Sequence, residues 1–194
     1  MYNLFFKRII DFTLSVIALP ILAIVFIIIA PLVFISDFGP VLYSANRIGR
    51  NGKLFRMHKF RTMKVNSPDI RLADGSTYNG EDDPRVTKIG KFLRATSIDE
   101  IPQLINVLLG QMSLIGPRPD PPDWLERYPE EVKVFLSVRP GITGYSQAYF
   151  RNSVDGIEKM KNDVFYAKNI SFFFDCKILL RTLFTILKKE NIYK

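Results

Sequence analysis

The stretch Phe12–Ser36, FTLSVIALPILAIVFIIIAPLVFIS, contains no charged side chain, and only Thr13, Ser15 and Ser36 in it are polar. A membrane span needs about 20 apolar residues, so this run is long enough for one. It is too long for the apolar core of a signal peptide, and no small-residue cleavage site follows it. The sequence therefore predicts a retained membrane anchor over residues 1–38, followed by a folded domain over residues 39–194.

Two prolines, Pro20 and Pro31, interrupt the apolar run, and each removes a helical hydrogen bond and favours a kink. Basic flanks prefer the cytosolic side of a membrane. Both flanks satisfy that preference only if the segment enters and leaves on one face, as a re-entrant helix–break–helix. A straight span stays open, because the first flank has few charges, and a buried core helix is disfavoured because the run is apolar all round. The flanking cations are Lys7 and Arg8 before the run, and Arg47, Arg50, Lys53, Arg56, Lys59 and Arg61 after it.

The chain has 194 residues with 27 basic and 19 acidic side chains, a formal charge of +8. Such a surface attracts nucleic acid, anionic lipid headgroups or phosphorylated substrates, and charge alone does not choose among them. The single cysteine, Cys176, excludes an intrachain disulfide and a cysteine zinc cluster. The single histidine, His58, excludes a histidine-rich metal site but not magnesium, which prefers oxygen ligands.

The pattern after the anchor predicts a mainly α fold with one short β-hairpin. Asn51-Gly52 is a strong turn signal, so residues 41–60 are expected to form the hairpin. The polar stretch 66–83 is expected to be a loop, and Asp83-Pro84 to cap and open a helix. Apolar spacing predicts further helices over 101–108 and, more weakly, over 130–138. The stretch 172–187 predicts a basic amphipathic helix, which either lies in a membrane interface or packs on the domain.

The neighbouring carboxylates Asp99 and Glu100 are candidates for chemistry. One would act as a nucleophile, because aspartate forms acyl-phosphates, and the other would bind a metal. Magnesium and nearby arginines would be needed to attract a diphosphate to two carboxylates. Ser97–Glu100 also fits a capping box, and from the residues alone this structural interpretation is the favoured one. Pro102 conflicts with that register, so the helix is alternatively expected to begin after the pair.

Three arginines are candidates for anion binding. Arg118 lies between two prolines, which reduce the entropy lost when it binds a phosphate. Arg139 precedes Pro140-Gly141, and Gly141 and Gly144 would permit close backbone approach to a ligand. Arg94 lies five residues before Asp99. Ordinary turns and solvated arginines are the structural alternative for all three.

The order of these motifs resembles the bacterial sugar transferases, also called small monotopic phosphoglycosyl transferases. The resemblance covers nearly the whole chain. Each motif alone is weak, but seven in order with compatible spacing are specific. They are Lys7-Arg8 with Asp11, RIGRNG at 47–52, KFRTM at 59–63, DPRVT at 83–87, TSIDEIPQL at 96–104, MSLIGPRP at 112–119, and RPGITG at 139–144.

The resemblance implies a re-entrant N-terminal helix and a compact, mainly helical catalytic domain on the cytosolic face of the cytoplasmic membrane. It implies transfer of a sugar 1-phosphate from a UDP-sugar to undecaprenyl phosphate, with release of UMP and with Mg²⁺ as cofactor, as a first step of glycoconjugate assembly. By the matching positions, Asp99 is the nucleophile and Glu100 the magnesium ligand. Arg118 contacts the UDP part and Arg94 a phosphate, and Lys59 and Arg139 join the same polar pocket.

Some positions depart from the family pattern. The family usually has a Ser-Pro break about one turn beyond Pro20, and usually has Trp-Ala-Gln where this chain has Tyr145-Ser146-Gln147. The alternative function is a non-catalytic, membrane-anchored module that binds lipid or glycan phosphate. A nucleic-acid-binding protein is disfavoured, because the anchor is uncharged and no nucleic-acid-binding motif is present. The sequence leaves the sugar, the pathway and the oligomeric state open, and a homodimer is allowed.

Overall fold

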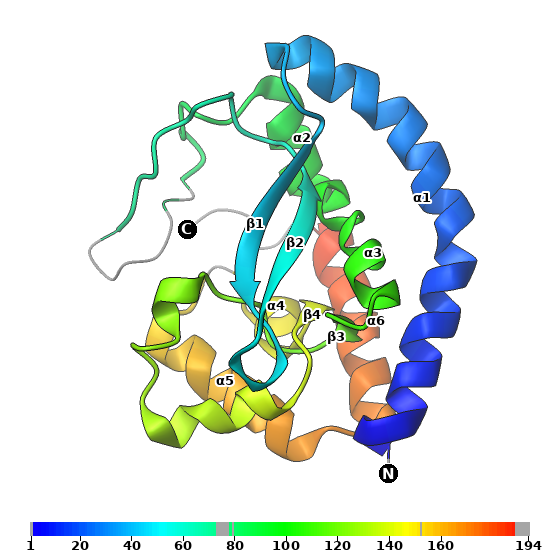
Figure 1. The fold of residues 1–194 in the computed structure, drawn as a ribbon, viewed down its shortest axis with the longest axis vertical. Coiled ribbons are helices and arrows are strands. Elements are labelled where there is room, and N and C mark those ends of the chain that lie inside the picture. Colours follow the sequence, from blue (N-terminus) through cyan, green and yellow to red (C-terminus); the bar gives the residue numbers. More distant parts are fainter. Residues whose placement is uncertain (1, 73–77, 79, 152, 189–194) are drawn as a thin grey trace.

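The computed structural model describes residues 2–72, 78, 80–151 and 153–188 (Figure 1). The described part is mainly helical, with one antiparallel hairpin and one short parallel strand pair. The helices are α1 (Lys7–Asp37), α2 (Lys88–Thr96), α3 (Gln103–Leu108), α4 (Tyr145–Tyr149), α5 (Gly156–Asn169) and α6 (Phe172–Lys188). The strands are β1 (Leu42–Ile48), β2 (Leu54–Phe60), β3 (Ser113–Ile115) and β4 (Gly141–Thr143). Tyr2–Phe6 form a π-helix, and 3₁₀ turns cover Arg50–Gly52, Ile98–Glu100, Pro122–Trp124 and Glu130–Ser137.

Helix α1 is continuous through Pro20 and Pro31, so the predicted break within residues 1–38 is not seen. The helix curves along one side of the domain (Figure 1). A narrow seam faces the domain and includes the buried Ser15, Leu22 and Ile29, which recur every seven residues. Most other apolar residues of α1 are exposed, such as Ile27 at 72%. Among the described residues, α1 is the one helix long and apolar enough to cross a membrane.

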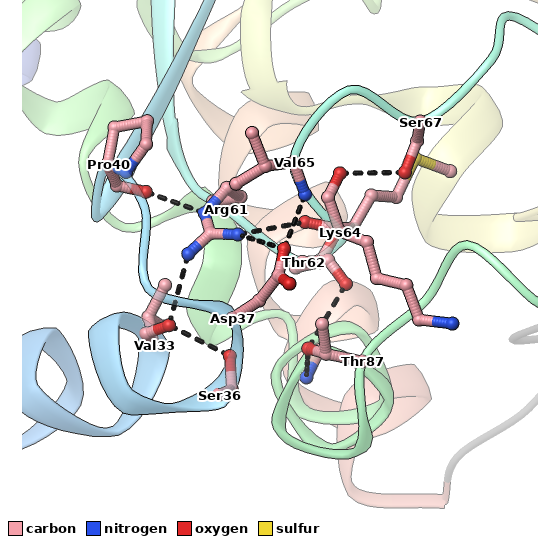
Figure 2. A network of polar contacts seen from close by, with 12 residues as sticks. Val33, Ser36, Asp37, Pro40, Arg61, Thr62, Lys64, Val65, Ser67 and Thr87 are labelled. Atoms are coloured by element: carbon pink, nitrogen blue, oxygen red, sulfur yellow. Dashed lines mark hydrogen bonds and ion pairs between the residues drawn. The ribbon is translucent and has the colours of Figure 1, made fainter.

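Both ends of α1 are fastened to the domain by ion pairs, each with at least one buried partner. At its start, Lys7 Nζ lies 2.6 Å from Asp175 Oδ2 of α6. At its end, the guanidinium of Arg61 donates to Asp37 Oδ2 at 2.9 Å, to the Pro40 carbonyl at 2.6 Å and to the Val33 carbonyl at 3.2 Å (Figure 2). The helix therefore leaves and rejoins the same globular body.

The predicted hairpin is confirmed, with Ile48 paired to Leu54 and Leu42 to Phe60. Asn51 and Gly52 both have positive φ, as that turn signal requires, within a longer connection that contains a 3₁₀ turn. Phe55 and Met57 point to the core, and Phe60 points to the other face, where it packs with Ile29 of α1. Side chains alternate along a strand, so Lys59 shares the inner face with Phe55 and Met57.

The predicted helix start at Asp83-Pro84 is wrong. Helix α2 begins at Lys88, and Thr87 is its cap, accepting a hydrogen bond from the Gly90 amide. The Asp83 carboxylate instead accepts hydrogen bonds from the backbone and guanidinium of Arg85, and both residues are buried. The Asp83 carboxylate thus forms a local ion pair with Arg85 and does not cap a helix. In the stretch 66–83, the described residues form no helix and no extended strand, as predicted.

The parallel pair β3–β4 was not predicted, and it changes the role of two glycines. A Cβ on Gly141 or Gly144 would collide with the backbone of Gly116. The two glycines therefore let two chain segments pack closely against each other. The prediction that they let a ligand approach the backbone is not supported. Helix α6 is confirmed, and its buried Ile178 packs with Ile115 and Tyr166.

Candidate functional site

A cavity of about 1360 Å³ lies between the hairpin, α2, the start of α3, the Pro-rich segment after β3, and helices α5 and α6. It exceeds the roughly 300–1,000 Å³ typical of sites for small ligands. Five of the six predicted site residues line it: Lys59, Arg94, Asp99, Glu100 and Arg118. Lys59 comes from β2, Arg118 from the segment after β3, and the other three from the continuous stretch 94–100, so packing brings Lys59 and Arg118 to residues that are already close in the chain.

The Asp99-Glu100 pair occupies a 3₁₀ turn between two helices. Ser97 has φ 59° and ends α2, and its amide donates to the Arg94 carbonyl. The capping box does not form, because the Ser97 side chain makes no capping hydrogen bond and the Glu100 carboxylate binds elsewhere. Helix α3 begins only at Gln103, as the alternative register predicted.

An asparagine holds this turn against the hairpin. Asn106 of α3 is fully buried; its Oδ1 accepts from the His58 amide at 3.1 Å, and its Nδ2 donates to the Arg56 carbonyl at 2.8 Å. These bonds fix α3 on the edge of β2. Lys59, the next residue of β2 after His58, therefore reaches the turn that precedes α3.

Glu100 is the anionic centre of an ion-pair cluster. Its Oε1 accepts from Lys59 Nζ at 2.6 Å and from Arg118 Nη2 at 3.0 Å. Burial raises the pKa of Glu100, but the charges of Arg118 and Lys59 outweigh it and lower the pKa to about 2. Burial also lowers the pKa of Lys59. The carboxylate of Glu100 is therefore ionised at any physiological pH.

Asp99 is 8% exposed and lines the cavity. Within the described ranges, no hydrogen bond or ion pair holds its carboxylate. Burial raises its pKa to about 6, against the opposing charge of Lys59. At neutral pH the group is an ionised carboxylate without a fixed partner, which is the state that a nucleophile requires.

The outer cations are placed differently from one another. Arg94 donates from Nε to Thr62 Oγ1 at 3.0 Å and faces the cavity. Arg139 donates from Nε to the Gly110 carbonyl at 3.0 Å and does not line the cavity. The structure therefore brings Arg94 to the pair but leaves Arg139 apart from the polar pocket in which it was expected.

The donor set fits magnesium. In the part of the chain that the structure describes, no three acidic, histidine or cysteine side chains gather into a metal cage. Magnesium does not need one, because it usually binds one or two carboxylates together with substrate phosphates and water. Glu100 has one carboxylate oxygen, Oε2, outside its two ion pairs, and Asp99 adds a second carboxylate next to it.

Sequence reasoning missed polar residues at two other walls of the cavity. Lys159 of α5 lies 2.7 Å from Asp120 Oδ2 and lines the cavity beside Arg118. Gln103 and Gln147 line it as well. The sequence could have indicated Gln103 as a site residue, because it follows Asp99 by four residues. Nothing in the local sequence distinguishes Lys159 from an ordinary lysine on a solvent-exposed helix face.

The sequence of this chain is similar to those of known proteins. The family model described as bacterial sugar transferase matches residues 2–189. The galactosyl transferase CpsE of Streptococcus agalactiae is 46% identical over 95% of this chain and 43% of its own length. The undecaprenyl-phosphate galactose phosphotransferase of Salmonella typhimurium is 40% identical over 97% of this chain and 42% of its own. The exopolysaccharide production protein ExoY of Sinorhizobium fredii is 36% identical over 96% of this chain and 88% of its own.

The chain thus spans less than half the length of the first two of these relatives, and the residues that the family model matches include the whole lining of the cavity. The match runs through helix α1, the hairpin, the Asp99-Glu100 turn and the whole of α6. The chain therefore belongs to the bacterial sugar transferase family.

Proposed function

We propose that this protein transfers a sugar 1-phosphate from a UDP-sugar to undecaprenyl phosphate and releases UMP. The observation that carries the proposal is the buried, unpaired carboxylate of Asp99 beside Glu100, in a cavity that also contains Lys59, Arg94 and Arg118. The names of the relatives support the substrates, since they contain undecaprenyl phosphate, galactose and glucose.

The reaction would take two displacements at one phosphorus. A carboxylate oxygen of Asp99 attacks the phosphorus that carries the sugar, and the bond from that phosphorus to the oxygen of UMP breaks. The electron pair leaves with UMP. A phosphate oxygen of the lipid then attacks the same phosphorus, the bond to Asp99 breaks, and the carboxylate is restored. The two bulky anions thus need not occupy the site together.

Each side chain has a role that follows from its contacts. Arg118 and Lys59, held by Glu100, offer positive charge to the diphosphate, and Arg94 offers it from α2. Magnesium, bound by Glu100, would supply further neutralisation of the developing charge on the phosphate oxygens. The fixed ion pairs preorganise this charge, so little reorganisation is needed when the substrate binds.

The same structure supports a place at the membrane surface. Both ends of α1 are fastened to one globular domain, through Lys7–Asp175 and Asp37–Arg61, while its outer face is apolar and exposed. A helix that spanned a membrane would separate its two ends by about 30 Å of hydrocarbon. We infer that α1 enters and leaves on one face, with the domain in the cytosol, where UDP-sugars are found.

The test is UMP release in detergent with magnesium, undecaprenyl phosphate and a panel of UDP-sugars. We expect release with one or more sugars and at least a 10³-fold loss in Asp99→Asn, because a displacement without its nucleophile must use another route. Without acceptor, radiolabelled sugar phosphate should stay on the wild-type protein and not on the variant. Asp123→Asn, a carboxylate outside the cavity, is the control. Equal release by the wild type and Asp99→Asn would refute the covalent route.

A further inference from the structure

Two glutamines line the cavity with amide atoms that have no partner. Gln103 is 2% exposed, and its Nε2 is buried without a hydrogen bond; Gln147 has both Nε2 and Oε1 buried without one. Buried polar groups are nearly always hydrogen-bonded in native proteins. Orphaned amides in the wall of a cavity therefore indicate a polar ligand that completes them.

Gln103 lies on the same side of its segment as Asp99. Ile101 and Pro102, which join the 3₁₀ turn to α3, both have right-handed helical dihedrals. The backbone thus keeps helical dihedrals from the 3₁₀ turn into α3, and Asp99 and Gln103 both line the cavity. A group bound by Gln103 would lie one helical turn from the reacting phosphorus at Asp99.

Gln147 lines the same cavity from a different helix. It belongs to α4, and just beyond the end of that helix Arg151 Nη2 donates to Ser97 Oγ at 3.3 Å, two residues before Asp99. The cavity wall near Gln147 includes Leu179, Thr182 and Leu183 of α6, and Arg151 also lines the cavity. Described cations that face the pair, such as Lys59 and Arg118, come from the other segments of the site.

We propose that Gln103 and Gln147 bind hydroxyl groups of the sugar in the donor. A hydroxyl both donates and accepts, so it satisfies Oε1 and Nε2 of an amide equally. An anion has no proton to donate, so Oε1 of Gln147 would stay without a hydrogen bond. A hydrocarbon chain would leave all three orphaned amide atoms without one. The neighbouring leucines suit the apolar C–H faces of a sugar ring.

This inference rests on the proposed function, and a variant-by-substrate cycle tests it. Gln103→Leu and Gln147→Leu should each lower kcat/KM for the UDP-sugar about tenfold, the effect of one lost hydrogen bond. Each loss should disappear with the deoxy analogue of the donor that lacks the contacted hydroxyl. Affinity for UDP, which lacks the transferred sugar of the donor, should stay unchanged. Asn162→Leu is the matched control, because its buried Nδ2 is also unpartnered but the residue does not line the cavity.

Three results would overturn the inference. They are an equal loss with every deoxy analogue, a parallel loss of UDP affinity, and an equal loss in Asn162→Leu. If the wild type releases no UMP, the proposed chemistry fails, and the glutamines are then judged by binding alone. In that case, the ratio of the Kd for UDP to the Kd for a UDP-sugar should fall in both glutamine variants. An unchanged ratio would refute the sugar site.

Discussion

Replacing Asp175 with asparagine should unfasten the start of α1 from the domain. The Asp175 carboxylate is 5% exposed and accepts three hydrogen bonds, from Lys7 Nζ at 2.6 Å, Tyr2 Oη at 2.7 Å and Tyr166 Oη at 2.8 Å. The Lys7 side chain is itself only 8% exposed. Asp175→Asn therefore removes the ion-pair partner of a buried ammonium and leaves it only the more distant charge of Asp11.

The expected cost is about 3–5 kcal/mol of unfolding free energy, the usual cost of removing one partner of a buried pair. Urea unfolding in detergent, followed by the fluorescence of Trp124, the only tryptophan, measures it. With a denaturant slope of about 2 kcal/mol/M, the midpoint should fall by about 2 M. Asp123→Asn is the control: it breaks only half-exposed ion pairs, with Arg71 and Arg127, and should cost less than about 1 kcal/mol.

A double variant separates the lost pair from other damage. Lys7→Met combined with Asp175→Asn removes the stranded charge, so the double variant should be more stable than the sum of the two single effects predicts. A single-variant cost below about 1 kcal/mol, or strictly additive costs, would refute the view that this pair fastens the helix.

The remaining predictions concern a titrating carboxylate and the other end of α1. Burial raises the pKa of Asp163 to about 7, against the nearby charge of Lys159, so the folded state binds this proton more tightly than the unfolded state does. The wild type therefore loses stability as pH rises from about 4 to 7. Asp163→Asn should be more stable than the wild type at pH 8 and equally stable near pH 4, and thermal unfolding at both pH values would show this. The same stability difference at both pH values would contradict it. Arg61→Lys should lower stability by about 1–3 kcal/mol, because one ammonium cannot replace the fork that reaches Asp37 and three carbonyls. The exposed Arg56→Lys in the hairpin should have no effect, and equal melting temperatures for the two variants would count against the role of Arg61.

Local patterns in the sequence predicted the elements whose cause is local. The uncharged run gave a long apolar helix, Asn51-Gly52 the hairpin turn, and the amphipathic spacing helix α6. The start of α2 was misplaced because Asp83 has a nearby competitor, Arg85, for its carboxylate. The strands β3 and β4 are too short for any periodicity to mark them.

The roles of the site residues needed the tertiary structure. From local sequence, Ser97–Glu100 is a better capping box than a catalytic pair. Only the packing of β2 and the Pro-rich segment against this turn brings Lys59 and Arg118 to Glu100 and leaves Asp99 unpaired. Arg139, in a similar proline-containing motif, instead donates a hydrogen bond to the Gly110 carbonyl.

The sequence by itself determined the apolar helix, the basic character and the order of the family motifs, because each of these depends on residue type and near-neighbour spacing. The tertiary structure decided which charges meet, which amides stay unpartnered beside Asp99, and that both ends of α1 are fastened to one body. Those features join residues up to 168 positions apart in the chain, as Lys7 and Asp175 are. The energy of such pairs depends on burial and distance, which arise only when the chain has folded.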